Sequence, residues 1–331
     1  MKIPEFNKNL ELEPFNTFGE GFDRFDFPAD MIRVTSGHGG ESFLIVGSEK
    51  TALYDCGMAY CGESTVENIE EALAKLHEAG KIDRETIDCI FLSHSHYDHI
   101  GALPYILDRY PDAVVYGSAK CQSVLQRENA RKLIAALGKE ARDLYTPGSG
   151  KEIRTDGLKV DVALHDGDCV SLGDLTVTAY ETKGHTDCSL SYYLEPVGLL
   201  MTSESTGILE GKDYVHTPSL KSFPDSLVSC EKCEAIHPNY ICLPHFGMLP
   251  KDFNEKYFDM FRAEVSSKMA FVRGMKAEGL EYEEMLARYI KRYWTPAKEQ
   301  EQPIEAFEIN SGHILNALLR AIDEEGENRN V

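Results

Sequence analysis

The sequence predicts an α/β fold: an αββα sandwich of two mixed β-sheets flanked by helices, followed by a C-terminal helical extension. Two observations support this prediction. Between residues 31 and 250, short apolar segments with strand character are followed by amphipathic helical segments, and this order occurs twice. After Pro250 the pattern becomes helical and rich in charge. We therefore expect an N-terminal extension over 1–30, a sandwich domain over 31–250 and a helical extension over 251–331.

The first half of the sandwich is predicted between residues 31 and 145. Its early strands are expected at 31–34, 42–46 and 51–54, with glycine-containing turns between them. A helix over 64–79 follows, because Ile69, Leu73 and Leu76 recur at helical spacing. Next we expect a buried strand at 90–92, a helix at 103–110, a strand at 113–116 and a mostly helical stretch at 118–145.

The second half is predicted from residue 160 onwards. Strands are expected within 160–180, followed by a hairpin whose two strands are 189–194 and 199–201. The helical extension is expected at 251–290 and 303–324, joined by a loop over 295–303. Residues 1–30 show no periodicity, so they either pack across the surface or contribute a cap near the functional site.

Composition excludes several classes of function. The formal net charge of −21 argues against nucleic acid and against anionic membranes as partners, because both bind basic surfaces. No apolar run has the length of a signal peptide or of a membrane span, and the cysteine count of nine is odd. These features predict a cytoplasmic protein in a reducing compartment.

The segment from Ser93 to Gly101 carries the strongest chemical signal in the chain. It directly follows the predicted strand at 90–92 and contains His94, His96, Asp98 and His99. Because side chains alternate along an extended segment, His94 and His96 project to the same side. Asp98 and His99 lie where the chain turns into a helix, so they can point at a second place nearby. One loop can thus hold two cations, roughly 3.5–4 Å apart in typical two-metal hydrolases.

Three further candidate ligands occur downstream. These are His185, Glu204 and His245, and each lies just past a short hydrophobic strand. Residues that directly follow strands lie together at one edge of a sheet, so we expect these three to complete the site. Tyr214 and His216 lie between the last two candidates and are predicted to line the substrate pocket.

The order H-x-H-x-D-H, G-H-T, an acid after a strand and a late histidine resembles the metallo-β-lactamase fold superfamily over roughly residues 30–250. The resemblance implies a role for each ligand. His94, His96 and His185 would hold one metal, Asp98, His99 and His245 would hold the second, and Glu204 falls where the family usually has a bridging Asp. Asp55 would brace the segment from Ser93 to Gly101, hereafter the metal loop. The donors suit two divalent ions, Zn²⁺ first and Fe²⁺ or Mn²⁺ as alternatives.

The function implied is a dinuclear hydrolase that cleaves a small ester-like bond with a metal-bridging hydroxide. Asp98 and Glu204 are the expected catalytic residues, with Asp98 orienting the nucleophile and passing a proton to the leaving group. The helical C-terminal extension is similar to the branch that includes the quinolone-signal response protein, whose members are thioesterases. This places a thioester slightly ahead of a phosphodiester or a lactone.

Two other functions remain open. Glu is one methylene longer than Asp, so Glu204 could block the position of the nucleophile and make the chain a metal-bound effector or binding protein. A di-iron redox protein ranks lowest, because the related branch has Glu at the position of His96 and carries a flavin domain. The C-terminal helices either roof the site or form a homodimer contact, and their apolar residues fit both roles.

Overall fold

The computed structural model describes residues 23–211, 214–294, 298, 302 and 304–328. Its first sheet contains six strands: β1 Met31–Arg33, β2 Phe43–Val46, β3 Thr51–Tyr54, β4 Cys89–Phe91, β5 Val114–Ser118 and β6 Val162–Leu164, in that order. The first three strands pair antiparallel, and β3 to β6 pair parallel. All residues of β2, β3 and β4 are buried, as expected for strands covered on both faces.

The second sheet also contains six strands, in the order β14-β13-β10-β9-β8-β7. They are β7 Cys169–Ser171, β8 Thr176–Glu181, β9 Leu190–Glu195, β10 Leu199–Met201, β13 Tyr240–Leu243 and β14 Gly247–Met248. Strands β9 and β10 form the predicted hairpin, and β10 and β13 are the parallel pair of this sheet. A separate two-stranded ribbon of β11 Ile208–Gly211 and β12 Tyr214–His216 follows β10; the sequence patterns did not predict it.

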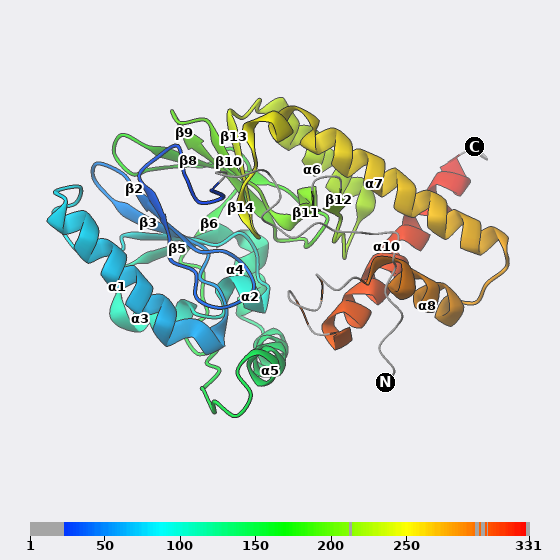
Figure 1. Cartoon of the computed structure of the whole chain (residues 1–331), viewed down its shortest axis with the longest axis horizontal. Helices are drawn as coiled ribbons and strands as arrows, with labels where there is room; N and C mark the ends of the chain where they lie inside the picture. Colours follow the sequence, from blue (N-terminus) through cyan, green and yellow to red (C-terminus); the bar gives the residue numbers. More distant parts are fainter. Residues whose placement is uncertain (1–22, 212–213, 295–297, 299–301, 303, 329–331) are drawn as a thin grey trace.

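Helices cover both outer faces of the two sheets (Figure 1). The helices near the first sheet are α1 Gly62–Glu78, α2 Tyr97–Ile100, α3 Leu103–Arg109, α4 Ala119–Leu125 and α5 Glu128–Tyr145, with a 3-10 turn η1 at Ala59–Cys61. Those near the second sheet are α6 Phe223–Ala235, α7 Lys251–Ala277, α8 Tyr282–Tyr293 and α10 Ile304–Asn328, with η2 at Glu204–Thr206.

Three hydrophobic clusters hold these layers together. One lies between the sheets and contains Phe43, Phe91 and Tyr192. A second joins the first sheet to α1 and α3, and a third joins the second sheet to α6, α7, α8 and α10. The predicted αββα sandwich with C-terminal helices is therefore confirmed.

The structure refines two of the predicted helical stretches. The stretch over 118–145 is divided between α4 and α5, and the stretch over 251–290 between α7 and α8. The second break has a clear cause, because Gly279 adopts φ +76° and Glu281 and Glu284 form a capping box at the start of α8.

The beginning of the chain is described only in part. Of the predicted extension over 1–30, residues 1–22 lie outside the described residues. Phe25 and Phe27 pack against Phe43, with ring centroids 6.5 and 5.1 Å away. No helix within the described part of the chain is long and apolar enough to cross a membrane. All nine cysteines are described and unpaired.

Candidate metal centre

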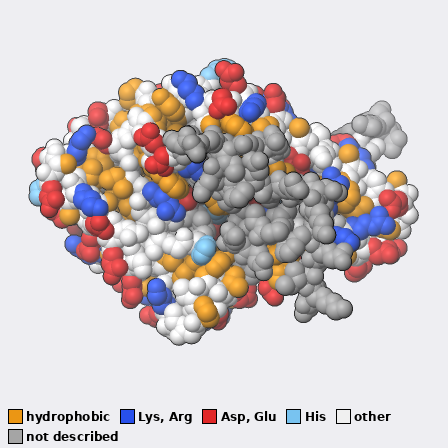
Figure 2. All heavy atoms as spheres, viewed as in Figure 1, with side chains coloured by type: hydrophobic (Ala, Val, Ile, Leu, Met, Phe, Trp, Pro, Cys, Tyr) orange, Lys and Arg blue, Asp and Glu red, His pale blue; other side chains and the backbone are white. Residues whose placement is uncertain are grey.

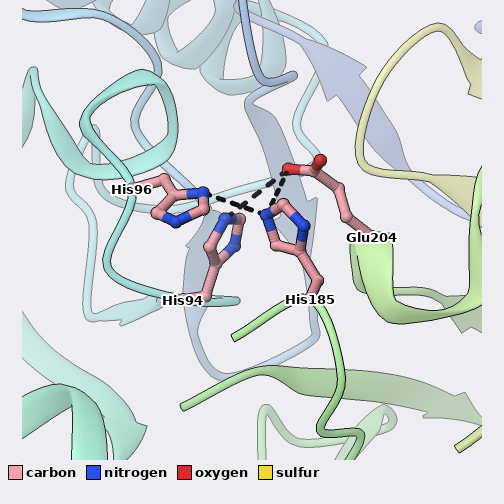
Figure 3. Close-up of side chains that lie close together, drawn as sticks. All are labelled: His94, His96, His185 and Glu204. Carbon is pink, nitrogen blue, oxygen red and sulfur yellow. Dashed lines mark hydrogen bonds and ion pairs between the residues drawn. The ribbon is translucent and has the colours of Figure 1, made fainter. Parts of the chain in front are cut away.

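The predicted ligands come from loops that follow strands of both sheets. His94 and His96 follow β4, and the next turn of chain, α2, carries Asp98 and His99. On the second sheet, His185 follows β8, Glu204 opens η2 after β10, and His245 lies between β13 and β14. Figure 3 shows four of these side chains pointing toward one another: His94, His96, His185 and Glu204.

The seven side chains form two groups that share one residue. His94, His96, His185 and Glu204 make the first group, and Asp98, His99, Glu204 and His245 make the second. Within each group, the potential ligand atoms all lie within 4.8 Å of one another. The structure thus brings together every metal ligand expected from the sequence, in the two sets expected.

Glu204 lies at the junction of these groups. Its Oε1 atom is 3.1 Å from Nε2 of His99 and 3.5 Å from Nε2 of His94. The same oxygen is 3.4 Å from Nε2 of His185 and 3.4 Å from Nε2 of His245. One carboxylate oxygen therefore faces four imidazole nitrogens, two from each group.

Hydrogen bonds on the far side of the rings fix the tautomers of three histidines. His99 Nδ1 donates to Asp55 Oδ2 at 2.9 Å, and His185 Nδ1 donates to the carbonyl oxygen of Pro218 at 2.5 Å. His94 Nδ1 donates to Ser93 Oγ at 2.9 Å, and that hydroxyl donates to Asp55 at 2.6 Å. Because each Nδ1 is used in these hydrogen bonds, Nε2 is the ring nitrogen that each neutral histidine can offer to a cation beside Glu204.

The remaining geometry tests whether these residues fit a cation. The Nε2 atom of His94 is buried and makes no hydrogen bond, which is costly for a polar atom unless something else coordinates it. His96 Nδ1 lies 2.9 Å from His185 Nε2, so a second ring nitrogen converges on the same place. Convergent imidazole lone pairs beside a carboxylate are the donor set of Zn²⁺ and related divalent ions, and the residues therefore fit.

The charges of the site follow from burial and from its neighbours. Burial lowers the pKa of His94 well below its usual range, and burial also lowers the pKa of His96 to about 3. Burial opposes protonation of His99 and His245 as well, but the facing carboxylates outweigh it and raise their pKa values. Although burial would raise the pKa of Glu204, the surrounding imidazoles hold it well below its usual range. The carboxylate is thus ionised, as a metal ligand must be.

A cavity of about 340 Å³ opens over the two groups. Of the ligands, those that reach its surface are His96, Asp98, His185, Glu204 and His245. His94 and His99 are fully buried behind them. A molecule in the cavity would meet a surface of ligand atoms from both groups.

The two predicted pocket residues have different positions. His216, only 6% exposed, lines the cavity, and burial lowers its pKa well below the usual range. Tyr214 lies two residues earlier, at the start of β12, and it packs within the hydrophobic cluster of the C-terminal helices. The structure therefore brings His216 to the cavity but not Tyr214.

Several described residues that line the cavity were not anticipated. Helix α10 supplies Phe307, Asn310 and Ile314, and α5 supplies Leu137, so α10 is the C-terminal helix that contributes described residues to the lining. His38 also lines the cavity and stacks on the ring of Tyr145 at 4.2 Å.

One sequence signal could have located the loop around His38. Glycines occur at 37, 39 and 40. A Cβ atom added to Gly40 would lie 2.6 Å from the ring of His99, so this position must lack a side chain. The cluster of glycines therefore marks a loop that passes directly against the metal loop.

Comparisons with known proteins agree with this geometry. The sequence model of the metallo-beta-lactamase superfamily matches residues 36–245. A metallo-beta-lactamase fold-containing protein of Sulfurisphaera tokodaii is 26% identical over 207 residues, which cover 62% of this chain and 77% of that protein. A hydroxyacylglutathione hydrolase of Photorhabdus laumondii is 53% identical over 150 residues, 43% of this chain and 46% of the relative, so the match spans less than half of the relative's length.

A solved structure supports the fold over a longer stretch. A metallo-beta-lactamase family protein of Thermus thermophilus superposes with a TM-score of 0.59 at 18% sequence identity. The superposition covers 89% of this chain and 94% of the other. At this level of identity the similarity shows a common fold.

Proposed function

The chain belongs to the metallo-beta-lactamase superfamily, and from this premise we propose that it is a dinuclear metal-dependent hydrolase of a small ester-like bond. The observation that carries the proposal is the pair of ligand groups that share Glu204. Each group offers imidazole nitrogens and carboxylate oxygens within 4.8 Å of one another, beneath a cavity of about 340 Å³. The proposed occupants of the two groups are two divalent cations, with Zn²⁺ as the first candidate.

The chain's own residues would prepare the site for chemistry. Bound cations would supply an activated water and polarise the bond under attack. Asp55 and the Pro218 carbonyl hold His99 and His185 in fixed tautomers, so the ligand atoms need no rearrangement. Asp98 Oδ2 lies 3.5 Å from His99 Nε2 and 3.7 Å from His245 Nε2, and the side chain reaches the cavity. It is placed to orient the attacking water and to give a proton to the leaving group.

An acyl thioester is the proposed substrate class, ahead of a phosphodiester or a lactone. Relatives named hydroxyacylglutathione hydrolases support this order, since an acylglutathione is a thioester. The net charge of −21 supports a small molecule as substrate, with no nucleic-acid or membrane partner. On the face in Figure 2, lysines and arginines are scattered among acidic side chains rather than gathered in one basic patch over the described residues.

The position of the Glu204 carboxylate supports a second candidate function. Oε1 of Glu204 lies 3.1 to 3.5 Å from four imidazole nitrogens, a position where it could exclude a water from the site. A protein blocked in this way would be a metal-bound effector or binding protein.

The hydrolase proposal is tested by turnover of Zn-, Mn- and Fe-loaded protein on an acyl thioester, a phosphodiester, a lactone and a β-lactam. We expect metal-dependent turnover of one class. The variants His96→Ala and Asp98→Ala should lose turnover together with bound metal, measured by elemental analysis. The exposed His165→Ala is the matched control and should retain both. Full activity in either ligand variant would contradict the mechanism.

Substitution of Glu204 by Asp separates the two candidate functions. If Glu204 is a working bridge, shortening it by one methylene should reduce turnover by roughly 10–100-fold, because a metal-supporting carboxylate is misplaced. If Glu204 instead blocks the site, Glu204→Asp should create or greatly raise hydrolysis. The comparison is made at equal metal content in both proteins.

A further inference from the structure

The cavity over the candidate metal centre has two chemically different sides. One side is formed by the ligand atoms described above. A second part of the lining comes from α10 and α5, which are far apart in sequence. A substrate that presents its reacting bond to the ligands can therefore place an adjoining group against this second part of the lining.

This second part of the lining is mainly apolar, with Asn310 as its polar member. Phe307, Asn310 and Ile314 lie three and four residues apart on α10, so they share one face of the helix. Leu137 of α5 and Leu220 lie among the same lining residues. Phe307 is fixed from behind by Trp294, whose ring centroid is 5.1 Å away. The helices thus offer a preformed apolar wall rather than a flexible loop.

The charged side chains that line the cavity, other than the candidate ligands, pair with one another. Apart from the candidate ligands, Arg33 and Glu41 are the charged residues among the described lining residues. They form an ion pair, with Arg33 Nε and Nη2 donating to the Glu41 carboxylate at 2.7 and 3.3 Å. Asn310 Nδ2 donates to Gln302 Oε1 at 3.3 Å. No unpaired cation therefore faces the cavity from the described residues to receive a phosphate or a second carboxylate.

We infer that the face of α10 formed by Phe307, Asn310 and Ile314, together with Leu137, is an acyl pocket that selects substrates with an uncharged, apolar acyl group. This inference rests on the proposed function, since it describes the substrate of the same site. In the reaction, the C–S bond of the thioester breaks, the oxygen of water bonds to the carbonyl carbon, and a water proton goes to the thiolate. The apolar acyl chain lies against the wall while the carbonyl carbon faces the ligands.

The first experiment measures kcat/KM of the Zn-loaded protein for straight-chain acyl thioesters of one carrier thiol, from two to ten carbons. Each methylene that enters the pocket should raise kcat/KM about fourfold, until the chain meets the wall and the series levels off. Binding of the matching primary amides, which keep the carbonyl but resist hydrolysis, is measured by calorimetry and should show the same dependence on length.

Two substitutions change the depth of the pocket in opposite directions. Leu137→Trp fills the pocket and should shift the preferred acyl length downward, whereas Ile314→Ala deepens the pocket and should shift it upward. Each variant has a control on its own helix. Leu133 on α5 is 60% exposed and Ile309 on α10 is 54% exposed, so Leu133→Trp and Ile309→Ala should leave the length profile unchanged.

Failure of the inference and failure of the proposed function give different results. Thioester turnover that is equal for all acyl lengths, or a profile that Leu137→Trp does not move, would overturn the acyl pocket and leave the hydrolase intact. A preference for charged acyl groups such as succinyl would overturn it too. Absence of any turnover, with amide binding that still depends on length, would overturn the hydrolase and retain the pocket.

Discussion

At the scale of single residues, Asp55 organises the metal loop. It lies just after β3 with φ +46°, in the left-handed region that a residue with a Cβ rarely adopts. In this conformation its carboxylate accepts hydrogen bonds from the backbone nitrogen of Ser93 at 2.7 Å, from the Ser93 hydroxyl and from His99 Nδ1. One fully buried carboxylate thereby orients the ring of His99 directly and the ring of His94 through the Ser93 hydroxyl.

Replacement of this carboxylate should weaken metal binding without removing a ligand. In Asp55→Asn the amide nitrogen cannot accept a hydrogen bond, so either Ser93 or His99 loses its acceptor. We expect metal affinity to fall roughly 10–100-fold, as for other residues that orient metal ligands. Competition with a chromophoric chelator measures the change, and the exposed Asp112→Asn serves as control. Equal affinities in the wild type and Asp55→Asn would show that Asp55 does not orient the ligands.

The ligands themselves could be predicted from the sequence because their signals are local. Four of them lie in one short segment, and the other three each follow an apolar strand. Their division into two groups also follows from the resemblance to a known family. The contacts of Glu204 could not be predicted, because a single methylene decides where its carboxylate ends and the surrounding backbone sets that position.

At the scale of elements, α7 links the C-terminal helices to the site. Lys268 on α7 is fully buried, and its Nζ donates to Thr217 Oγ1 at 2.8 Å. Thr217 lies between His216, which lines the cavity, and Pro218, whose carbonyl holds His185. The helix therefore anchors the segment that positions one of the candidate ligands.

The buried ammonium of Lys268 gives stability a distinct dependence on pH. Burial lowers the pKa of Lys268 from 10.5 to about 8, with Glu264 opposing and Arg292 adding to the shift. Between these pH values the unfolded chain binds more protons than the folded one, so the free energy of unfolding rises with pH. The stability gained when Lys268 is uncharged is fully present above pH 10.5. It is lost as the pH falls through about 8, where the buried side chain becomes protonated.

The variant Lys268→Met isolates this effect from other titrating groups. Relative to the variant, the wild type should gain on the order of 3 kcal/mol of unfolding free energy as the pH rises through this window. Urea unfolding of both proteins at several pH values measures the gain, and the exposed Lys276→Met on the same helix should behave as the wild type does. If the difference in unfolding free energy between the wild type and Lys268→Met stays constant with pH, the pKa of Lys268 is not lowered by burial.

The elements could be predicted unevenly from the sequence. Strands β2 to β4 and helix α1 have strong apolar patterns, and the structure contains them close to the predicted positions. The ribbon of β11 and β12 was not predicted, since its pairing depends on contacts with α7 and not on a local pattern. The break between α7 and α8 depends on one glycine within a continuous helical pattern.

At the scale of the whole molecule, the site exists because three hydrophobic clusters fix the two sheets and the C-terminal helices relative to one another. The sandwich brings the strand ends of both sheets together, and this arrangement could be predicted from the repeated β-then-α order. The residues of α5 and α10 that line the cavity could not be predicted, because packing between segments far apart in the chain brings Leu137 and Ile314 to it.

The two-metal character of the site is tested by titration of metal-free protein with Zn²⁺, followed by calorimetry and elemental analysis. We predict two ions per chain for the wild type. Because Glu204 is shared by both groups, Glu204→Gln should weaken both binding steps. A single bound ion, or two ions whose binding Glu204→Gln leaves unchanged, would contradict a dinuclear centre joined by this carboxylate.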